Sequence, residues 1–189
     1  SCPVLTILVE KDQKKVWPEL KMPKIYTKAG DEGESSTLNG KKVSKASDVF
    51  EALGDIDELN ANIGLVIANL NDETKRTNLE TIQSTLFSIG ANIASDGDLE
   101  KIPEKKITSL ESTIDRYEKT LPNLRNFILP GGNQIASQIH LTRAVCRRAE
   151  RSLVRLNNHK LRSQVKFLNR LSDFLFILAR LVNQENNFK

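Results

Sequence analysis

The sequence has few of the residues that build disulfide scaffolds, aromatic cores or membrane spans. Only 5% of its 189 residues are aromatic, and its two cysteines, Cys2 and Cys146, lie far apart in the chain. A disulfide framework or a cysteine-based metal site is therefore not expected, and a reducing compartment is the default. No apolar run approaches the length of a membrane span, so we expect a soluble protein with no membrane partner.

Common catalytic signatures are also missing. The two histidines, His140 and His159, have no Cys or His partner at metal-ligand spacing. The chain has neither a Gly-x-Ser-x-Gly elbow nor a Gly-x-Gly-x-x-Gly fingerprint. A P-loop is suggested by Gly33 and by Gly40 with Lys41, but too many residues separate the glycines and Lys42 stands where Ser or Thr is needed. These absences argue against conventional hydrolytic, metal-dependent and P-loop chemistry.

Long amphipathic helices are what the sequence does contain. Apolar residues recur every three or four positions in five segments, which we expect to be helices at about 47–70, 73–94, 103–121, 134–156 and 160–184. Short connections make neighbouring helices antiparallel, so we expect an all-α fold, a five-helix up-and-down bundle. No convincing strand pattern, repeat or low-complexity tract is present.

The length is typical of one domain. We expect an extended arm over residues 1–24, which contains three prolines, followed by a single domain over residues 25–186. Within the domain, a polar loop over residues 26–45 precedes the helical bundle, residues 47–186. The chain begins at Ser1 rather than Met, so an upstream segment with an organelle address is a possible loss.

The loop reads YTKAGDEGESSTLNGKKVSK and has almost nothing to bury. It holds three Gly, three Ser, two Thr and four Lys. One interpretation is an unstructured segment. The other is a phosphate nest, in which backbone N–H groups and hydroxyls surround an anion. Local sequence alone leaves both open.

The fourth expected helix carries a stripe of arginines. At about 100° per residue, Arg143, Arg147 and Arg151 lie on one side, opposite an apolar face. This stripe is either a solvated basic face or a set of guanidinium groups that grip phosphates. The formal charge of +4 is modest, so anionic small molecules are favoured as much as nucleic acid.

The fifth expected helix is apolar round most of its circumference, which indicates a central or interface position. Its remaining stripe holds Asn169, Asp173 and Phe176. Either Asn169 and Asp173 contact the arginines of the fourth helix in a structural role, or Asn169 faces a ligand. Asp57, early in the first helix, either complements the helix dipole or pairs with an arginine across an interface.

Separated blocks of the sequence together resemble one family. They are YTKAGDEGESSTL, FEALGDIDELNANIG, FILPGG running into HLTRAVCRRAER, and KFLNRLSDFLFILAR, in this order. They resemble the PduO-type ATP:cob(I)alamin adenosyltransferases, a corrinoid adenosyltransferase family that includes the human mitochondrial enzyme. The resemblance covers about residues 23–183 and implies a ferritin-like helical bundle that assembles as a homotrimer with active sites between subunits.

The resemblance also implies an activity and a set of site residues. The implied reaction transfers the 5′-deoxyadenosyl group of ATP to cob(I)alamin, releases triphosphate and forms adenosylcobalamin, with Mg²⁺ bridging the phosphates rather than bound by side chains. The matching positions are Arg147, Arg143 and Asp57 for catalysis; Thr27, Lys28, Ala29, Gly30, Ser35, Ser36, Lys45, Arg147, Arg148, Glu150, Arg151 and Asn169 for ATP; and Phe127, Asp173 and Phe174 for cobalamin. Asp57 is expected to pair across the interface with Arg143, and Phe127 to keep the lower base off the cobalt.

Two residues depart from the family pattern in the loop. Ala29 stands where the family usually has Thr, which removes a hydroxyl, and Glu34 is an unusual neighbour for a polyanion. The alternative function is a non-catalytic protein that binds ATP or cobalamin and delivers the cofactor. Nucleic-acid binding is disfavoured, because the arginine stripe is short and flanked by Glu. Implied partners are a cob(II)alamin reductase and an adenosylcobalamin-dependent mutase or dehydratase, in the mitochondrial matrix of a eukaryote or otherwise in the cytoplasm.

Overall fold

The computed structural model describes residue 26 and residues 28–188 of the chain. The expected arm over residues 1–24 and the predicted nucleotide contact Thr27 lie outside the described residues. The elements are, in chain order, β1 (Glu34–Ser36), β2 (Lys42–Ser44), α1 (Asp48–Asn69), α2 (Glu73–Ala94), α3 (Glu104–Glu118), α4 (Gln134–Arg155), the 3-10 turn η1 (His159–Leu161) and α5 (Arg162–Glu185).

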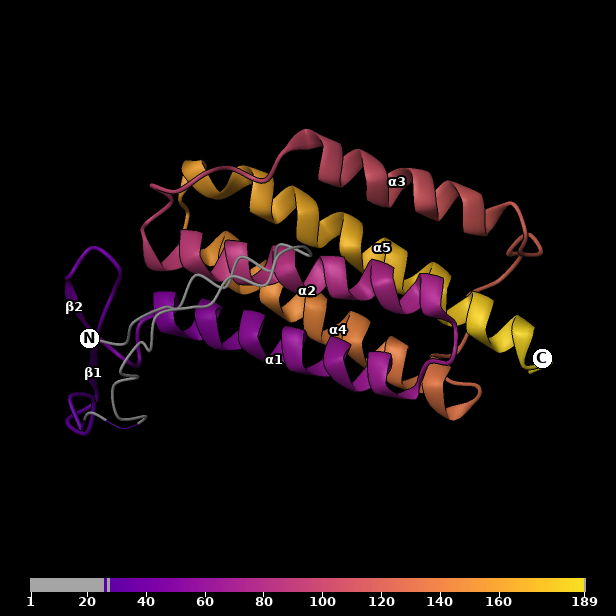
Figure 1. The fold of residues 1–189 in the computed structure, drawn as a ribbon, viewed down its shortest axis with the longest axis horizontal. Helices are drawn as coiled ribbons and strands as arrows, with labels where there is room; N and C mark the ends of the chain where they lie inside the picture. The colour runs from indigo at the N-terminus through magenta and orange to yellow at the C-terminus, as the bar shows by residue number, and fades with distance from the viewer. Residues whose placement is uncertain (1–25, 27, 189) are drawn as a thin grey trace, which may run out of the picture.

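The five helices lie alongside one another and alternate in direction (Figure 1). The principal packing pairs are α4 with α5, α1 with α4, α1 with α2, and α3 with α5. The prediction of an all-α, up-and-down five-helix bundle is therefore confirmed. No helix within residues 28–188 is both long and apolar enough to cross a membrane.

The core forms because each helix has apolar residues at helical spacing. On α1, Leu59, Ile63 and Val66 are fully buried, while α5 buries residues on several sides because it packs against both α3 and α4. Burying one such side chain contributes about 1.5–3 kcal/mol. The central position expected for the fifth helix follows from this packing.

The segment before α1 differs from its prediction. The sequence shows no strand pattern, yet β1 and β2 pair as an antiparallel hairpin in which Ser35 lies opposite Val43. Each strand has three residues and almost no apolar side chains, so the alternation that indicates a half-buried strand is absent. Backbone hydrogen bonds, rather than burial of apolar side chains, hold this hairpin at the end of the bundle where α1 begins (Figure 1).

Candidate functional site

The hairpin gives the polar loop a defined conformation. The Nζ atom of Lys45 donates to the carbonyl oxygen of Gly30 at 2.7 Å, and the Lys45 backbone N–H donates to the carbonyl of Gly33 at 2.8 Å. Lys28 and Gly33 have positive φ angles of 60° and 80°. These features close residues 28–45 into a compact turn, so this part of the chain is an ordered loop.

The hairpin is also fastened to the bundle at its far end. The Leu38 backbone N–H donates to the carbonyl of Ala94 at 2.9 Å, and the Asn39 side-chain amide donates to the carbonyl of Ser95 at 3.0 Å. The end of α2 therefore fixes the position of the hairpin relative to α1. The predicted nucleotide contacts Lys28, Ala29, Gly30, Ser35, Ser36 and Lys45 all lie on this one anchored loop.

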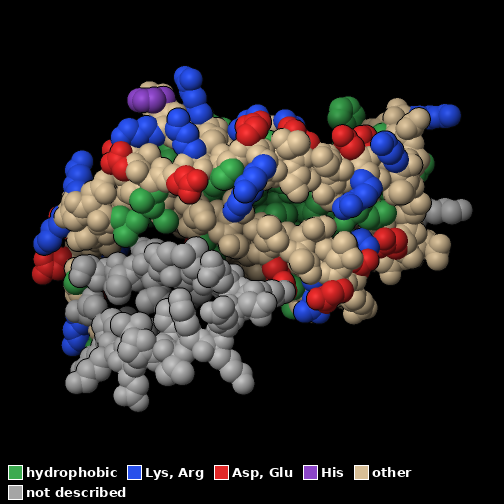
Figure 2. Space-filling view, turned by 45° about the horizontal axis from the view of Figure 1, so that its top comes forward, with side chains coloured by type: hydrophobic (Ala, Val, Ile, Leu, Met, Phe, Trp, Pro, Cys, Tyr) green, Lys and Arg blue, Asp and Glu red, His purple; other side chains and the backbone are tan. Residues whose placement is uncertain are grey.

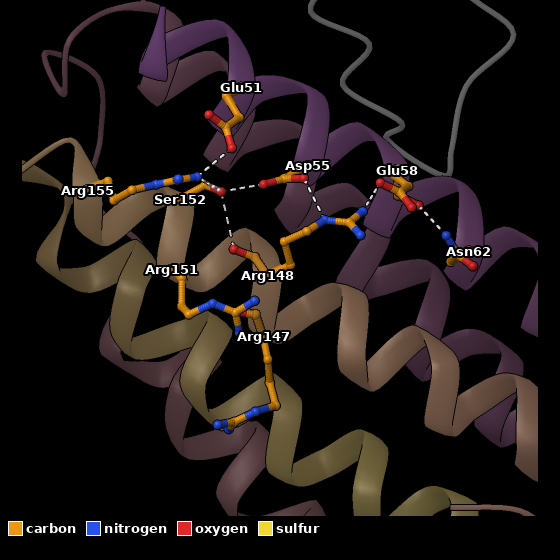
Figure 3. Close-up of polar contacts among 9 residues, drawn as sticks. All are labelled: Glu51, Asp55, Glu58, Asn62, Arg147, Arg148, Arg151, Ser152 and Arg155. Atoms are coloured by element: carbon orange, nitrogen blue, oxygen red, sulfur yellow. Dashed lines mark hydrogen bonds and ion pairs between the residues drawn. The ribbon is translucent and has the colours of Figure 1, made fainter.

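The arginines of α4 divide into two sets that face different neighbours (Figure 3). The Nε atom of Arg148 donates to Asp55 at 2.9 Å, and its Nη2 atom pairs with Glu58, both on α1. Arg155 pairs with Glu51 of α1 at 2.5 Å. Arg148 thus has protein carboxylates as partners, and its predicted contact with ATP stays a prediction.

The second set consists of Arg147 and Arg151, which point away from the α1 carboxylates (Figure 3). Both are exposed, and no carboxylate of the described residues forms an ion pair with either of them. The Arg151 guanidinium group donates to the backbone carbonyl of Arg147 at 3.1 Å, and the two residues lie one turn apart on the same side of α4. They are well placed to bind an external anion such as a polyphosphate.

A cavity of about 1050 Å³ lies between α3, α4 and α5 and is bounded by residues 124–128. Side chains of several chemical types line it, including Arg143 and Arg147 of α4, Asp173 and Phe176 of α5, Asp115 of α3, and Phe127. Its volume reaches the upper end of the range of small-molecule sites. Arg147 therefore lies where a phosphate-bearing ligand and a large apolar ligand can meet.

Phe127 lies on the segment that bounds this cavity, and its ring is fully exposed in the single chain. Its neighbours Ile128 and Leu129 are also exposed. Three consecutive exposed apolar side chains on an irregular segment indicate a surface that a ligand or another subunit covers. The contact of Phe127 with a corrinoid stays a prediction.

Arg143 contacts the aromatic wall of the cavity. Its guanidinium carbon lies 5.7 Å from the centroid of the Phe176 ring, within the range of a cation–π interaction. His140 lies 6.2 Å from the same ring, and burial, reinforced by the charge of Arg143, lowers its pKa. The Nε atom of Arg143 is buried and lacks a hydrogen-bond partner among the described residues.

The predicted site residues of α5 differ in their surroundings. Asn169 donates to Glu150 of α4 at 3.0 Å, and Asp173 pairs with Arg170 at 3.0 Å, so neither meets an arginine of α4. Phe174 was expected to contact cobalamin, but it is 1% exposed and packs beside Tyr117 at a ring-centroid distance of 6.3 Å. Phe174 is therefore a core residue that does not line the cavity, whereas Phe176 does.

Asp57 is exposed on α1, and it has no ion pair or hydrogen bond from its carboxylate to any described residue. The structure of one chain does not bring it to Arg143. Its predicted pairing across an interface stays a prediction.

Sequence reasoning missed two features of the site. Phe176 was placed on one stripe of the fifth helix with Asn169 and Asp173 but was given no role, and that spacing was a usable signal. The carboxylates Glu51, Asp55 and Glu58 recur at helical spacing on α1, and this pattern matches the spacing of Arg148 and Arg155. Which arginines of α4 these carboxylates contact depends on the rotation of α4 about its axis, and local sequence does not specify that rotation.

The face shown in Figure 2 gives no continuous basic surface. Lys and Arg side chains are interspersed there with Asp and Glu. Nucleic-acid binding without sequence preference needs a basic groove that follows the backbone. This face therefore offers no support for a nucleic-acid partner.

Comparison with known proteins adds the family context of this site. Residues 25–182 match the family model described as cobalamin adenosyltransferase. The chain is 43% identical over 172 residues to the corrinoid adenosyltransferase MMAB of Homo sapiens, covering 85% of this chain and 69% of that protein. It is 41% identical over 168 residues to a cobalamin adenosyltransferase of Cupriavidus metallidurans, covering 87% of this chain and 90% of that protein.

A solved structure gives the same result at the level of the fold. A variant PduO-type ATP:corrinoid adenosyltransferase from Lactobacillus reuteri, complexed with cobalamin and ATP, has a TM-score of 0.82 and 35% sequence identity to this chain. The match covers 87% of this chain and 94% of that chain.

Proposed function

The chain belongs to the cobalamin adenosyltransferase family, and we propose that it transfers the 5′-deoxyadenosyl group of ATP to cob(I)alamin. The cobalt of the reduced corrinoid forms a bond to the ribose C5′ carbon. The C5′–O bond breaks, and its electron pair leaves with triphosphate. The products are adenosylcobalamin and triphosphate.

The cavity beside Arg147 is the observation that supports this function best. One large space is lined by an exposed aromatic ring, suited to a corrinoid, and by a guanidinium group, suited to a phosphate. The nucleophile belongs to the substrate, so the reaction needs no catalytic triad from the protein. The protein has to hold two reactants in line and to stabilise charge on the leaving group.

We assign the polyphosphate to Arg147 and Arg151 together with the hairpin. Lys28, Gly30, Ser35, Ser36 and Lys45 provide backbone N–H groups, hydroxyls and ammonium groups for the nucleotide. Ala29 contributes only backbone groups and a methyl group. Asn169 and Glu150, which bond to each other on neighbouring helices, are proposed to lie at the edge of the nucleotide site.

Phe127, Asp173 and Phe176 are proposed to face the corrinoid. A bulky apolar ring beside the lower face of the cobalt excludes the lower axial base. The reduction of cobalt(II) becomes easier when no donor opposes the orbital that accepts the electron. Arg143, stacked on Phe176, is proposed to reach Asp57 of a neighbouring subunit.

Mg²⁺ is proposed to arrive with ATP. Within residue 26 and residues 28–188, no group of three or more His, Cys, Asp or Glu side chains is arranged to hold a metal ion. The phosphate oxygens of ATP are therefore the ligands expected for Mg²⁺, which neutralises part of their charge.

A homotrimer is proposed, in which Asp57 of one subunit pairs with Arg143 of the next. A cob(II)alamin reductase would supply the substrate, and an adenosylcobalamin-dependent mutase or dehydratase would consume the product. We propose the mitochondrial matrix as the compartment of a eukaryotic source and the cytoplasm as that of a bacterial source. Relatives occur in both groups of organisms.

A turnover assay tests the function. The protein is mixed with ATP, Mg²⁺, hydroxocobalamin and a strong reductant, and the absorbance of adenosylcobalamin is followed. Formation of adenosylcobalamin with equimolar triphosphate is expected. Binding of ATP and corrinoid without this product would instead support the alternative, a non-catalytic cofactor-delivery protein.

A further inference from the structure

The C-terminal half of α4 is rich in arginines, and only some of them are free to bind a ligand. Four arginines, Arg147, Arg148, Arg151 and Arg155, occur within nine residues. Like charges four residues apart on a helix repel each other and destabilise the helix by about 0.2–0.5 kcal/mol per pair. The fold therefore has to pair some of these arginines with other side chains and leave the rest free.

Carboxylates of α1 pair with two of the four arginines. Glu51, Asp55 and Glu58 follow one stripe of α1 and meet Arg155 and Arg148 of the antiparallel helix α4. Figure 3 shows this set of contacts along the α1–α4 seam, with Arg147 and Arg151 directed away from it. Each arginine that meets a carboxylate is withdrawn from the anion-binding side.

Asp55 is the centre of this set. It is 9% exposed, so it is the most buried of the three carboxylates. One of its oxygens accepts from Arg148 Nε at 2.9 Å, and the other accepts from the hydroxyl of Ser152. Asp55 therefore fixes α4 at two positions one turn apart, and these positions alternate with Arg147 and Arg151 along the helix.

The position of Asp55 also connects the two halves of the nucleotide site. Asp55 lies on α1, the helix that directly follows the hairpin, and Arg147 and Arg151 lie on α4. A rotation of α4 about its axis would move both guanidinium groups relative to the hairpin. The contacts of Asp55 with Arg148 and Ser152 oppose this rotation.

We propose that Asp55 is a positioning residue for ATP, one that acts through Arg148 and Ser152 to hold Arg147 and Arg151 toward the triphosphate. This inference rests on the proposed function for the identity of the ligand. It assigns Arg148 a structural role in place of the direct ATP contact that the family resemblance implies.

The primary test is Asp55→Asn, which keeps the shape of the side chain and removes its charge. The chain offers a matched control. Lys75 is a buried cation shared by Asp72 at 2.8 Å and Glu185 at 2.8 Å, in the same way that Arg148 is shared by Asp55 and Glu58. Asp72→Asn removes one carboxylate from such a pair at the opposite end of α1, and Asn also serves as a helix N-cap.

For Asp55→Asn we expect kcat/KM for ATP to fall about tenfold, because the ion pair with Arg148 is lost and Arg147 and Arg151 are positioned less well. The affinity for inorganic triphosphate, measured by calorimetry, should weaken in parallel, while KM for the corrinoid stays near the wild-type value. Asp72→Asn should leave all three quantities unchanged. Sedimentation of each variant at the wild-type mass shows that assembly is intact.

A double-mutant cycle separates positioning from direct binding. If Arg148 acts only with Asp55, Arg148→Met should reproduce the effect of Asp55→Asn, and the double variant should be no worse than either single variant. Multiplicative losses would show that Arg148 and Asp55 act independently and would overturn the inference. Wild-type affinity for triphosphate in Asp55→Asn would also overturn it, whereas absence of turnover in the wild-type protein would overturn the proposed function instead.

Discussion

At the scale of single residues, Arg147 makes the strongest prediction. It is exposed, it lines the cavity, and it has no carboxylate partner in the described part of its own chain. Arg147→Ala should lower kcat/KM for ATP by about a hundredfold or more, because a bidentate contact to a charged leaving group is lost. Steady-state kinetics measures this, and gel filtration should show the same assembly.

A control for Arg147 is available on α3, at a residue that does not line the cavity. Arg116 is exposed on α3 and lies 5.4 Å from the ring centroid of Tyr117. Arg116→Ala removes an equal charge and should leave the kinetics unchanged. Near-normal activity of Arg147→Ala would remove that residue from the site.

Phe127 allows a test that separates the two substrates. Phe127→Ala should keep the affinity for ATP, because the ring lies on the cavity segment and not on the hairpin. It should lose the absorption and electron paramagnetic resonance signature of four-coordinate cobalt(II), since the lower base can return. Leu129→Ala, which removes a similarly exposed side chain from the same segment, is the control. An unchanged cobalt(II) spectrum in Phe127→Ala would contradict its assigned role.

His140 predicts a pH dependence of stability. Burial and the nearby charge of Arg143 hold the pKa of His140 below that of the unfolded chain. The unfolded state therefore binds the proton more readily, so the free energy of unfolding should decrease as pH falls from about 7.5 to about 5.5. Urea unfolding should show a smaller decrease for His140→Leu, which has no proton to bind. Equal slopes for both proteins would rule out this contribution.

At the scale of elements, Gly30 leaves room for the Lys45 side chain in the loop that carries the hairpin. A Cβ atom at Gly30 would lie 2.7 Å from Lys45 Nζ and 3.3 Å from the carbonyl oxygen of Glu34. Gly30→Ala should displace Lys45 and raise KM for ATP by about fivefold, the loss of roughly one hydrogen bond, with KM for the corrinoid unchanged.

Gly54 supplies the comparison for this substitution. It lies within α1, where an added Cβ would meet nothing within 4 Å. Gly54→Ala should raise the free energy of unfolding by up to about 1 kcal/mol, because Ala is the better helix former, and should not affect KM. A normal KM for ATP in Gly30→Ala would show that the contact between Lys45 and Gly30 is not needed for binding.

The helices could be predicted from the sequence more fully than the site. Residues 73–94 were expected to form a helix and do so as α2, because Leu79, Leu86 and Ile89 recur with the period of one buried face. The hairpin was not predicted, since its strands are held by backbone hydrogen bonds that leave no apolar pattern. The partners of the α4 arginines were not predictable either, because they depend on how α1 and α4 are rotated against each other.

At the scale of the whole molecule, the contacts along the α1–α4 seam change from charged at one end to uncharged at the other. At one end lie the charged contacts of Asp55 and Arg148. At the other end, Asn69 bonds to Gln138 at 3.3 Å, and Leu65 and Leu141 are exposed one turn away. Both leucines continue the same stripes as the charged residues, so they flank the seam on the same side. Exposed leucines from two packed helices on the same side of a seam favour a surface that another subunit covers.

The proposed homotrimer can be tested on this surface. The double variant Leu65→Asp with Leu141→Asp places two charges where apolar contact is expected, and it should sediment as a monomer and lose turnover, because a site between subunits cannot form without its neighbour. Phe87→Asp, at a single exposed aromatic on α2, should keep both the wild-type mass and its activity. Sedimentation velocity and the turnover assay together decide the matter. A double variant that retains the wild-type mass would place the interface elsewhere, and an active monomer would show that one chain holds the complete site.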